Sequence, residues 1–293
     1  MAKSDFNGWF AQLRHPYSSG SRPAVVRRGW NSVRGTRRVG IAILGVVALV
    51  SSVSGDRPGP AGDWMLLRVA FGQTEQVPLG DGRTVNLNTD SQIHVRLTDT
   101  QTQVVMDRGE ALFAGESAQA LRVTANDAVI TSRDGVFSVR MRDHGRTDLI
   151  VAQGTVEAGR TGRLLADWAE RALPEASDST RLSAGEAASV DGTGLYGKRT
   201  LAPDTLAHKL AWKDNWLWFS DETLAEAVER FNSYNTEQLI LADPRLSGMS
   251  LGGRFRPTEP DSFVASLKRV FDVRAVRIPA SSAGPQLVYL DVR

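Results

Sequence analysis

The sequence predicts a mainly β protein with an α+β C-terminal part. A β domain of short strands is expected over 64–200, followed by a split β-α-β-β-α-β unit over 201–293, with one transmembrane helix before both. Apolar residues alternate with polar ones in the first part and recur at helical spacing in the second. An uncharged apolar run at 39–55 predicts the membrane helix.

The N-terminal segment 1–38 is strongly basic. It holds eight Lys or Arg residues against Asp5 alone, so it carries about +7, whereas the rest has 27 basic and 32 acidic residues. Beside a membrane segment, such charge favours anionic headgroups and fixes orientation, and nucleic-acid binding is not expected. The arginines nearest the apolar run are expected to set that orientation: Arg27, Arg28, Arg34, Arg37 and Arg38.

The run 39–55 contains 17 uncharged residues, which is the lower limit for crossing a bilayer. The positive-inside rule places the tail in the cytoplasm, and the Gly- and Pro-rich stretch 56–63 is expected to be a linker. A cleaved export signal is the alternative, since Thr36 to Ile41 is loosely similar to a twin-arginine signal. We expect a single-pass inner-membrane protein, and either interpretation puts the body in the periplasm.

The first part of the body shows the alternation of half-buried strands. Apolar residues occupy every second position, with polar neighbours such as His94 and Arg96 between them, at Val85 and Leu87, at Ile93, Val95 and Leu97, and at Phe137, Val139 and Met141. Turn signals separate these runs at Gly80–Gly82, Asp107–Gly109 and Arg133–Gly135. The pattern predicts a stack of short antiparallel or coiled strands without a useful helix.

Residues 162–200 give a weaker pattern. A short helix is expected at Leu164–Leu173, ended by Pro174, followed by an irregular excursion with one strand around Arg181–Val190.

Beyond Leu201 the period becomes helical. One helix is expected at Asp221–Asn232, capped by Ser220 or Asp221, and a second at Pro260–Phe271 with Phe263, Leu267, Val270 and Phe271 on one face. Strands are expected around them at Trp216–Ser220, Gln238–Ala242, Ser250–Phe255, Val273–Ile278 and Leu287–Val292. This order is the split α+β unit.

The sequence offers no set of catalytic residues. It has no cysteine, its four histidines (His15, His94, His144 and His208) are scattered, and Gly80–Gly82 and Gly252–Gly253 are too short for a phosphate loop. The acids Asp107 and Glu110 flank a turn, where structural turn chemistry explains them. We therefore expect no enzyme, no cofactor and no metal.

Aromatic residues cluster at the start of the C-terminal part. The residues proposed to bind a partner are Trp212, Trp216, Trp218, Phe219 and Phe255. If the segment from Trp216 is a strand, Trp216 and Trp218 point to the same face and could anchor a partner strand or stack on a sugar. The alternative is that these rings pack beneath the helix that starts near Leu224.

Two stretches resemble the FecR family. Val77–Ser91 is similar to the family pattern L-x-D-G-S-x-V-x-L-N-x-x-S, and Arg108–Phe113 to G-E-A-x-F, at fitting spacing. The segment Ala211–Phe219 and the later pieces Leu224–Val228, Phe231–Asn235 and Leu251–Phe255 resemble the C-terminal part of the same proteins. That part is similar to the STN signalling domain of secretins and TonB-dependent transducers.

The resemblance implies a regulator of cell-surface signalling, with iron uptake as the usual context. Its periplasmic part would sense the signalling domain of a TonB-dependent outer-membrane receptor, for instance by strand addition at an edge of the C-terminal unit. Its cytoplasmic part would act on an extracytoplasmic-function sigma factor as an anti-sigma factor, although the tail 1–38 is shorter than the family's sigma-binding domain. The alternative is a periplasmic module that binds envelope polysaccharide without sigma factor control.

Overall fold

The computed structural model describes residues 64–161, 176, 178–280 and 284–292. Outside the described residues lie four expected segments: the tail 1–38, the anchor 39–55, the linker 56–63 and the helix Leu164–Leu173. Within the described part, no helix combines the length and the apolar character that a bilayer crossing needs.

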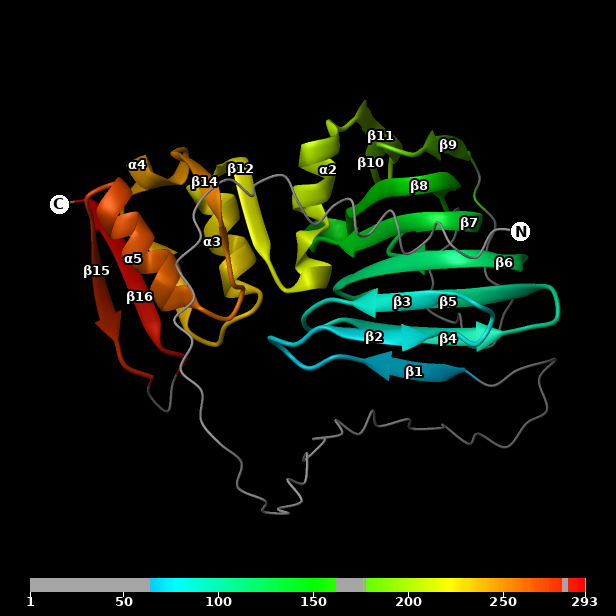
Figure 1. Ribbon diagram of the computed structural model, residues 1–293, viewed down its shortest axis with the longest axis horizontal. Coiled ribbons are helices and arrows are strands. Elements are labelled where there is room, and N and C mark those ends of the chain that lie inside the picture. The colour runs from blue at the N-terminus through cyan, green and yellow to red at the C-terminus, as the bar shows by residue number, and fades with distance from the viewer. Residues whose placement is uncertain (1–63, 162–175, 177, 281–283, 293) are drawn as a thin grey trace, which may run out of the picture. The chain divides into compact units, whose positions relative to one another are not determined.

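Eleven of the described strands form one sheet (Figure 1). Its main path runs β1-β4-β5-β6-β7-β8-β10-β11, with β2, β3 and β9 paired at its sides. The strands are β1 (Met65–Arg68), β2 (Glu75–Pro78), β3 (Thr84–Leu87), β4 (Gln92–Leu97), β5 (Gln101–Arg108), β6 (Glu110–Ala125), β7 (Ala128–Met141), β8 (Thr147–Arg160), β9 (Thr180–Ser183), β10 (Glu186–Asp191) and β11 (Gly194–Thr200).

The long strand β6 changes its pairing partner along its length, which bends the sheet. Its first half pairs antiparallel with β3, whereas its second half pairs in parallel with β5, and the register shifts between Glu116 and Leu121. Strands β6, β7 and β8 are longer than the short strands expected, because irregular positions bend them without ending them. Gly135 marks one such position: its φ is +105°, and a Cβ there would lie 2.2 Å from the Gln153 carbonyl oxygen.

The predicted alternation is confirmed in the core of this sheet. The residues expected to face inward are almost all buried, namely Val85, Leu87, Ile93, Val95, Phe137 and Val139, with Met141 packed partly buried against them. Leu97 is the exception, since it is 38% exposed at the end of β4. A 3₁₀ turn (η1, Asp143–Gly145) links β7 to β8.

The excursion after residue 178 is more regular than expected. In place of one strand around Arg181–Val190, the chain forms β9 and then the hairpin of β10 and β11, in which β10 also pairs with β8. The turn at Ala184–Gly185 divides the expected strand in two, and Gly185 has a φ of +83°.

The C-terminal part keeps the predicted order of its strands and its two longer helices, and it adds two short helices that the sequence analysis did not predict, Pro203–Lys209 and Pro244–Ser247. Its elements are α2 (Pro203–Lys209), η2 (Ala211–Asp214), β12 (Leu217–Thr223), α3 (Leu224–Asn232), β13 (Gln238–Leu241), α4 (Pro244–Ser247), β14 (Ser250–Phe255), α5 (Pro260–Val270), β15 (Val273–Ile278) and β16 (Leu287–Val292). Three strand ranges, those of β14, β15 and β16, agree with the sequence expectation at both ends.

Two sheets enclose α3 and α5 in this part (Figure 1). One sheet pairs β12 with β14, and the other has the order β13-β16-β15. Their inner faces and the two helices form a second hydrophobic cluster, separate from that of the large sheet. Four phenylalanine rings lie at its centre within 6.5 Å of one another: Phe219, Phe231, Phe255 and Phe263.

The helix ends differ from the expectation at two places. Thr223, rather than Ser220 or Asp221, caps α3, because β12 continues to that residue and Thr223 forms a capping box with Glu226. In α5, Phe263 and Leu267 are buried as expected, whereas Val270 is 65% exposed at the last turn.

Candidate functional site

The structure separates the five predicted partner-binding residues into two groups. Trp212 and Phe219 are buried, and Phe255 packs against the phenylalanine cluster. Trp216 and Trp218 are half-buried, and they lie on the outer side of the sheet formed by β12 and β14. For Phe219 and Phe255 the packing alternative therefore describes their surroundings, whereas Trp212 is buried outside that cluster. Trp216 and Trp218 lie at the surface.

Trp216 lies between two arginine side chains. The Cζ atoms of Arg254 and Arg256 lie 3.7 Å and 3.6 Å from its ring centroid. Two guanidinium groups at these distances would overlap on one face, so they cover opposite faces of the ring. Trp218 stacks on His208 with a centroid distance of 4.0 Å, and Arg254 lies 5.8 Å from its ring. These five side chains are called the arginine–tryptophan ladder below.

The spacing of two arginines in the sequence could have indicated the ladder, although the sequence analysis considered only the aromatic residues. Arg254 and Arg256 are two positions apart, so on a strand they share one face. Their partner strand could not be known, since it follows from the pairing of Trp218 with Arg254 across β12 and β14.

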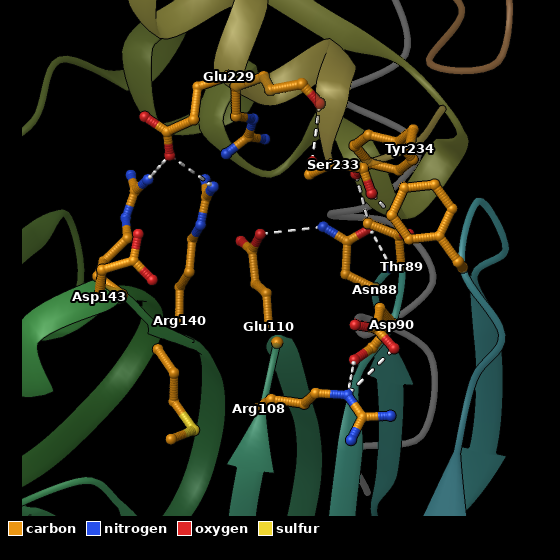
Figure 2. Close-up of a pocket in the computed structure, with 15 residues that line it drawn as sticks. Asn88, Thr89, Asp90, Arg108, Glu110, Arg140, Asp143, Glu229, Ser233 and Tyr234 are labelled. Atoms are coloured by element: carbon orange, nitrogen blue, oxygen red, sulfur yellow. Dashed lines mark hydrogen bonds and ion pairs between the residues drawn. The ribbon is translucent and has the colours of Figure 1, made fainter. Parts of the chain in front are cut away.

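A second feature is a cavity of ≈ 320 Å³ where α3 meets the large sheet (Figure 2). All described residues belong to one compact unit. The cavity is lined by Phe71 and by residues from four places: Asn88 to Asp90 after β3, Arg108 to Glu110 between β5 and β6, Arg140 to Asp143 at the end of β7, and Glu229, Arg230, Ser233 and Tyr234 at the end of α3.

A buried chain of hydrogen bonds crosses this cavity wall. The Tyr234 hydroxyl donates to Oδ1 of Asn88 at 2.6 Å, and Nδ2 of Asn88 donates to Oε2 of Glu110 at 3.0 Å. Beside it, Oγ1 of Thr89 donates to the Ser233 carbonyl at 2.9 Å. Because Asn88 and Glu110 both belong to the FecR-like motifs, those motifs bind the end of α3 directly.

Charged groups around the cavity perturb one another. Burial and the charge of Arg230 together lower the pKa of Arg140 to about 10, against the opposite effect of Glu110. Arg142 donates to Glu229 at 2.8 Å, and Arg140 lies 3.7 Å from the same carboxylate. Burial also raises the pKa of Tyr234 to about 12, so its hydroxyl stays a donor at every physiological pH.

A glycine of the motif allows this turn to form. Gly109 has a φ of +90°, and a Cβ on it would lie 2.2 Å from Oγ of Ser91. That hydroxyl accepts from the Glu110 amide and donates to the Glu110 carbonyl, both at 2.9 Å. The motif serine, glycine and glutamate therefore form one interlocked turn.

The first motif also contains a buried ion pair. Oδ2 of Asp81 lies 2.5 Å from Nη1 of Arg83, with side-chain exposures of 4% and 2%, and accepts from Thr102 at 2.6 Å. The second guanidinium nitrogen donates to the carbonyls of Gln119 and Arg133. Burial raises the pKa of Asp81, but the hydrogen bonds from Thr102 and Arg83 lower it by a larger amount. The pKa of Asp81 therefore lies below its ordinary value.

The acids Asp107 and Glu110 do not share a site. Asp107 accepts from Gln92 at 2.5 Å and lies 2.9 Å from Nε2 of His94 on a partly exposed strand face, whereas Glu110 belongs to the buried chain. Turn chemistry explained the glycine between them, but not the buried bonds of Glu110. Among the described residues, no group of three His, Asp or Glu side chains could hold a metal ion.

Comparisons with known proteins agree with these features. Residues 65–157 match the family model described as "FecR protein". A search of curated proteins found no match. Two crystal structures described as "a putative anti-sigma factor" from Parabacteroides distasonis ATCC 8503 are similar at 18% identity, with TM-scores of 0.57 and 0.58. They cover 77% and 78% of this chain and 98% and 99% of their own, and at this identity the likeness shows a shared fold.

The family match contains both motifs and the strands that carry them. Asp81, Arg83, Asn88, Ser91 and Glu110 all lie within the matched residues. Residues 65–157 are therefore similar to the FecR family, and over this segment the predicted resemblance is confirmed.

Proposed function

We propose that the chain is a membrane-anchored regulator of the FecR type that acts on an extracytoplasmic-function sigma factor. The observation that carries this proposal is the FecR match over residues 65–157, whose motif residues bind the end of α3. The description of the two similar structures as anti-sigma factors points to the same kind of partner. The sequence contributes the basic tail 1–38 as the cytoplasmic part that would contact it.

In this proposal the tail precedes a single inner-membrane helix at 39–55, and residues after 56 are periplasmic. The arginines before the apolar run, from Arg27 to Arg38, would fix that orientation. The C-terminal part, similar by sequence pattern to the STN domain, would receive the signalling domain of a TonB-dependent outer-membrane receptor. Strands β13 and β15, at the two edges of the three-stranded sheet, offer places for strand addition.

The bond between Tyr234 and Asn88 gives a route from the C-terminal part to the FecR domain. A receptor domain that shifts α3 would break this bond, the bond from Thr89 to Ser233, and the ion pair between Arg142 and Glu229. Because these contacts converge on one turn, a small movement of α3 would release the motif turn.

The polysaccharide-binding alternative loses its main support in the geometry of Trp216. A sugar ring stacks on a free aromatic face, and both faces of Trp216 are covered by guanidinium groups. Trp218 has one face against His208. The two surface tryptophans therefore do not provide the open platform that this alternative requires.

The test is mild crosslinking in native membranes, followed by affinity capture of the full chain and mass spectrometry. The expected result is recovery of a TonB-dependent receptor together with a sigma factor. The matched control is the same capture with Tyr196→Phe, a change at an exposed tyrosine that should recover both partners equally. Recovery of cell-wall fragments with neither protein would overturn the proposal.

A further inference from the structure

The arginine–tryptophan ladder has the geometry of a surface prepared for carboxylates. A guanidinium group stacked flat on an indole ring keeps its N–H fork at the ring edge, where it can bind a carboxylate through two parallel hydrogen bonds. Stacking holds Arg254 and Arg256 in place before any partner arrives, so less side-chain entropy is lost on binding.

Among the side chains that the structure describes, no acid forms an ion pair with Arg254 or Arg256. The nearby acids pair with lysines instead: Asp214 lies 2.6 Å from Lys213, and Glu222 lies 3.7 Å from Lys209. The contacts of Arg254 within the described part of the chain are with the rings of Trp216 and Trp218, and Arg256 donates from Nη1 to the Asn215 carbonyl at 3.0 Å. This surface thus carries two arginine charges, one exposed on β14 at Arg254 and one half-buried directly after it at Arg256.

The spacing of the two arginines selects the shape of the ligand. Arg254 lies in β14 and Arg256 directly follows its last residue, so with extended backbone their positions are about 6.6 Å apart. The two Cζ distances to Trp216 agree with this spacing, since one ring fits between them. An extended peptide presents alternate side chains at the same interval, so acids at positions i and i+2 would each meet one guanidinium.

We infer that the ladder binds an extended protein segment with acidic residues at alternate positions. Nucleic acid is disfavoured because a base needs an open aromatic face, which Trp216 lacks. If the proposed function holds, this segment belongs to the signalling domain of the receptor. The inference about the ladder itself does not require that partner, because any protein segment with alternating acids would make the same contacts.

The experiment measures binding of two fluorescent decapeptides of equal charge to the full chain in detergent micelles, by fluorescence anisotropy. One peptide alternates Glu and Thr over its ten residues, and the other has the same five Glu and five Thr in the order Glu-Glu-Thr-Thr-Glu-Glu-Thr-Thr-Glu-Thr, in which no two acids lie at positions i and i+2. The alternating peptide is expected to bind several-fold more tightly, and its affinity should fall as salt is raised.

Three double variants report on the mechanism. Arg254→Gln with Arg256→Gln should weaken the alternating peptide at least about fivefold, since two exposed charge pairs are lost. Arg254→Lys with Arg256→Lys keeps the charge without the fork and should lie between that variant and the wild type. The control, Lys268→Gln with Arg269→Gln on α5, changes net charge equally at exposed positions and should bind as the wild type does.

A circular dichroism melt of each variant establishes that it is folded. Equal binding by the wild type and by the Gln variant would overturn the inference. So would equal affinity for both peptides, or binding of a ten-nucleotide oligothymidine or of chitohexaose in place of peptide. The membrane crosslinking experiment is independent: its failure with successful peptide binding would refute the regulator and leave the ladder intact.

Discussion

The buried pair of Asp81 and Arg83 gives the sharpest prediction about stability. In Asp81→Ala the Arg83 guanidinium would remain in a site where its side chain is 2% exposed, without the carboxylate that neutralises it. Thr102 would lose its acceptor as well. Removing one partner of a buried, hydrogen-bonded pair costs about 3 to 5 kcal/mol.

The measurement is urea unfolding of the full chain in detergent, followed by circular dichroism. With a slope of about 3 kcal/mol per molar urea, the expected cost lowers the midpoint of the unfolding transition of the large sheet by about 1 to 1.7 M. The second variant adds Arg83→Met, which removes the stranded charge. Its midpoint should recover most of the loss, because replacing both partners by apolar groups is often nearly neutral.

A decrease below about 0.3 M for Asp81→Ala would refute the argument, since it would mean that water reaches the guanidinium group. A double variant as unstable as the single one would refute it in another way. The loss would then come from the turn geometry that Asp81 supports through the Arg83 amide, at 3.0 Å, and not from the charge.

Three further predictions concern the motif turn, pH and the contact with α3. Gly109→Ala should lower the melting temperature by several degrees, because a Cβ would overlap Oγ of Ser91 at a φ of +90°; an unchanged melting curve would contradict this. Burial raises the pKa of Asp148, but the bond from Ser189 and the neighbouring arginines lower it further, below its ordinary value of 3.8. Because the folded-state pKa is lowered, ionised Asp148 stabilises the fold above pH 3.8, and this contribution is lost as the pH falls further. Measuring the free energy of unfolding as a function of pH in the acid range checks this. Tyr234→Phe should lower the free energy of unfolding by about 1 kcal/mol and speed hydrogen exchange at Asn88, because the 2.6 Å bond is removed. If neither quantity changes, this bond contributes nothing to stability.

The sequence was sufficient for local structure where one physical pattern dominates. Alternation of apolar residues identified the buried faces around Ile93 and Phe137, because a strand with one buried face has a strict period of two. The helices α3 and α5 followed from their apolar spacing, although β12 continued to Thr223 and moved the cap. Strands β6 and β7 are longer than expected because the chain continues through bulges inside them. The sequence shows a turn-like pattern at such positions, so a bend within one strand looks like the end of a strand.

The sequence did not reveal how the motif residues act. It gave Asp107 and Glu110 the same turn role, yet only the tertiary structure places Glu110 beside Asn88 and within reach of Tyr234 through it. The residues Asn88 and Tyr234 are 146 positions apart in the chain, and no periodicity relates them.

The sequence by itself determined the mainly β character, the order of elements in the C-terminal part and the resemblance to the FecR family, because these depend on patterns within short segments. Tertiary structure alone decided which aromatic rings are buried and which are covered by arginine. Trp212 and Trp216 are equally apolar in sequence, but one is fully enclosed and the other lies between Arg254 and Arg256. Burial and cross-strand pairing depend on how distant segments meet, and local patterns carry no record of that.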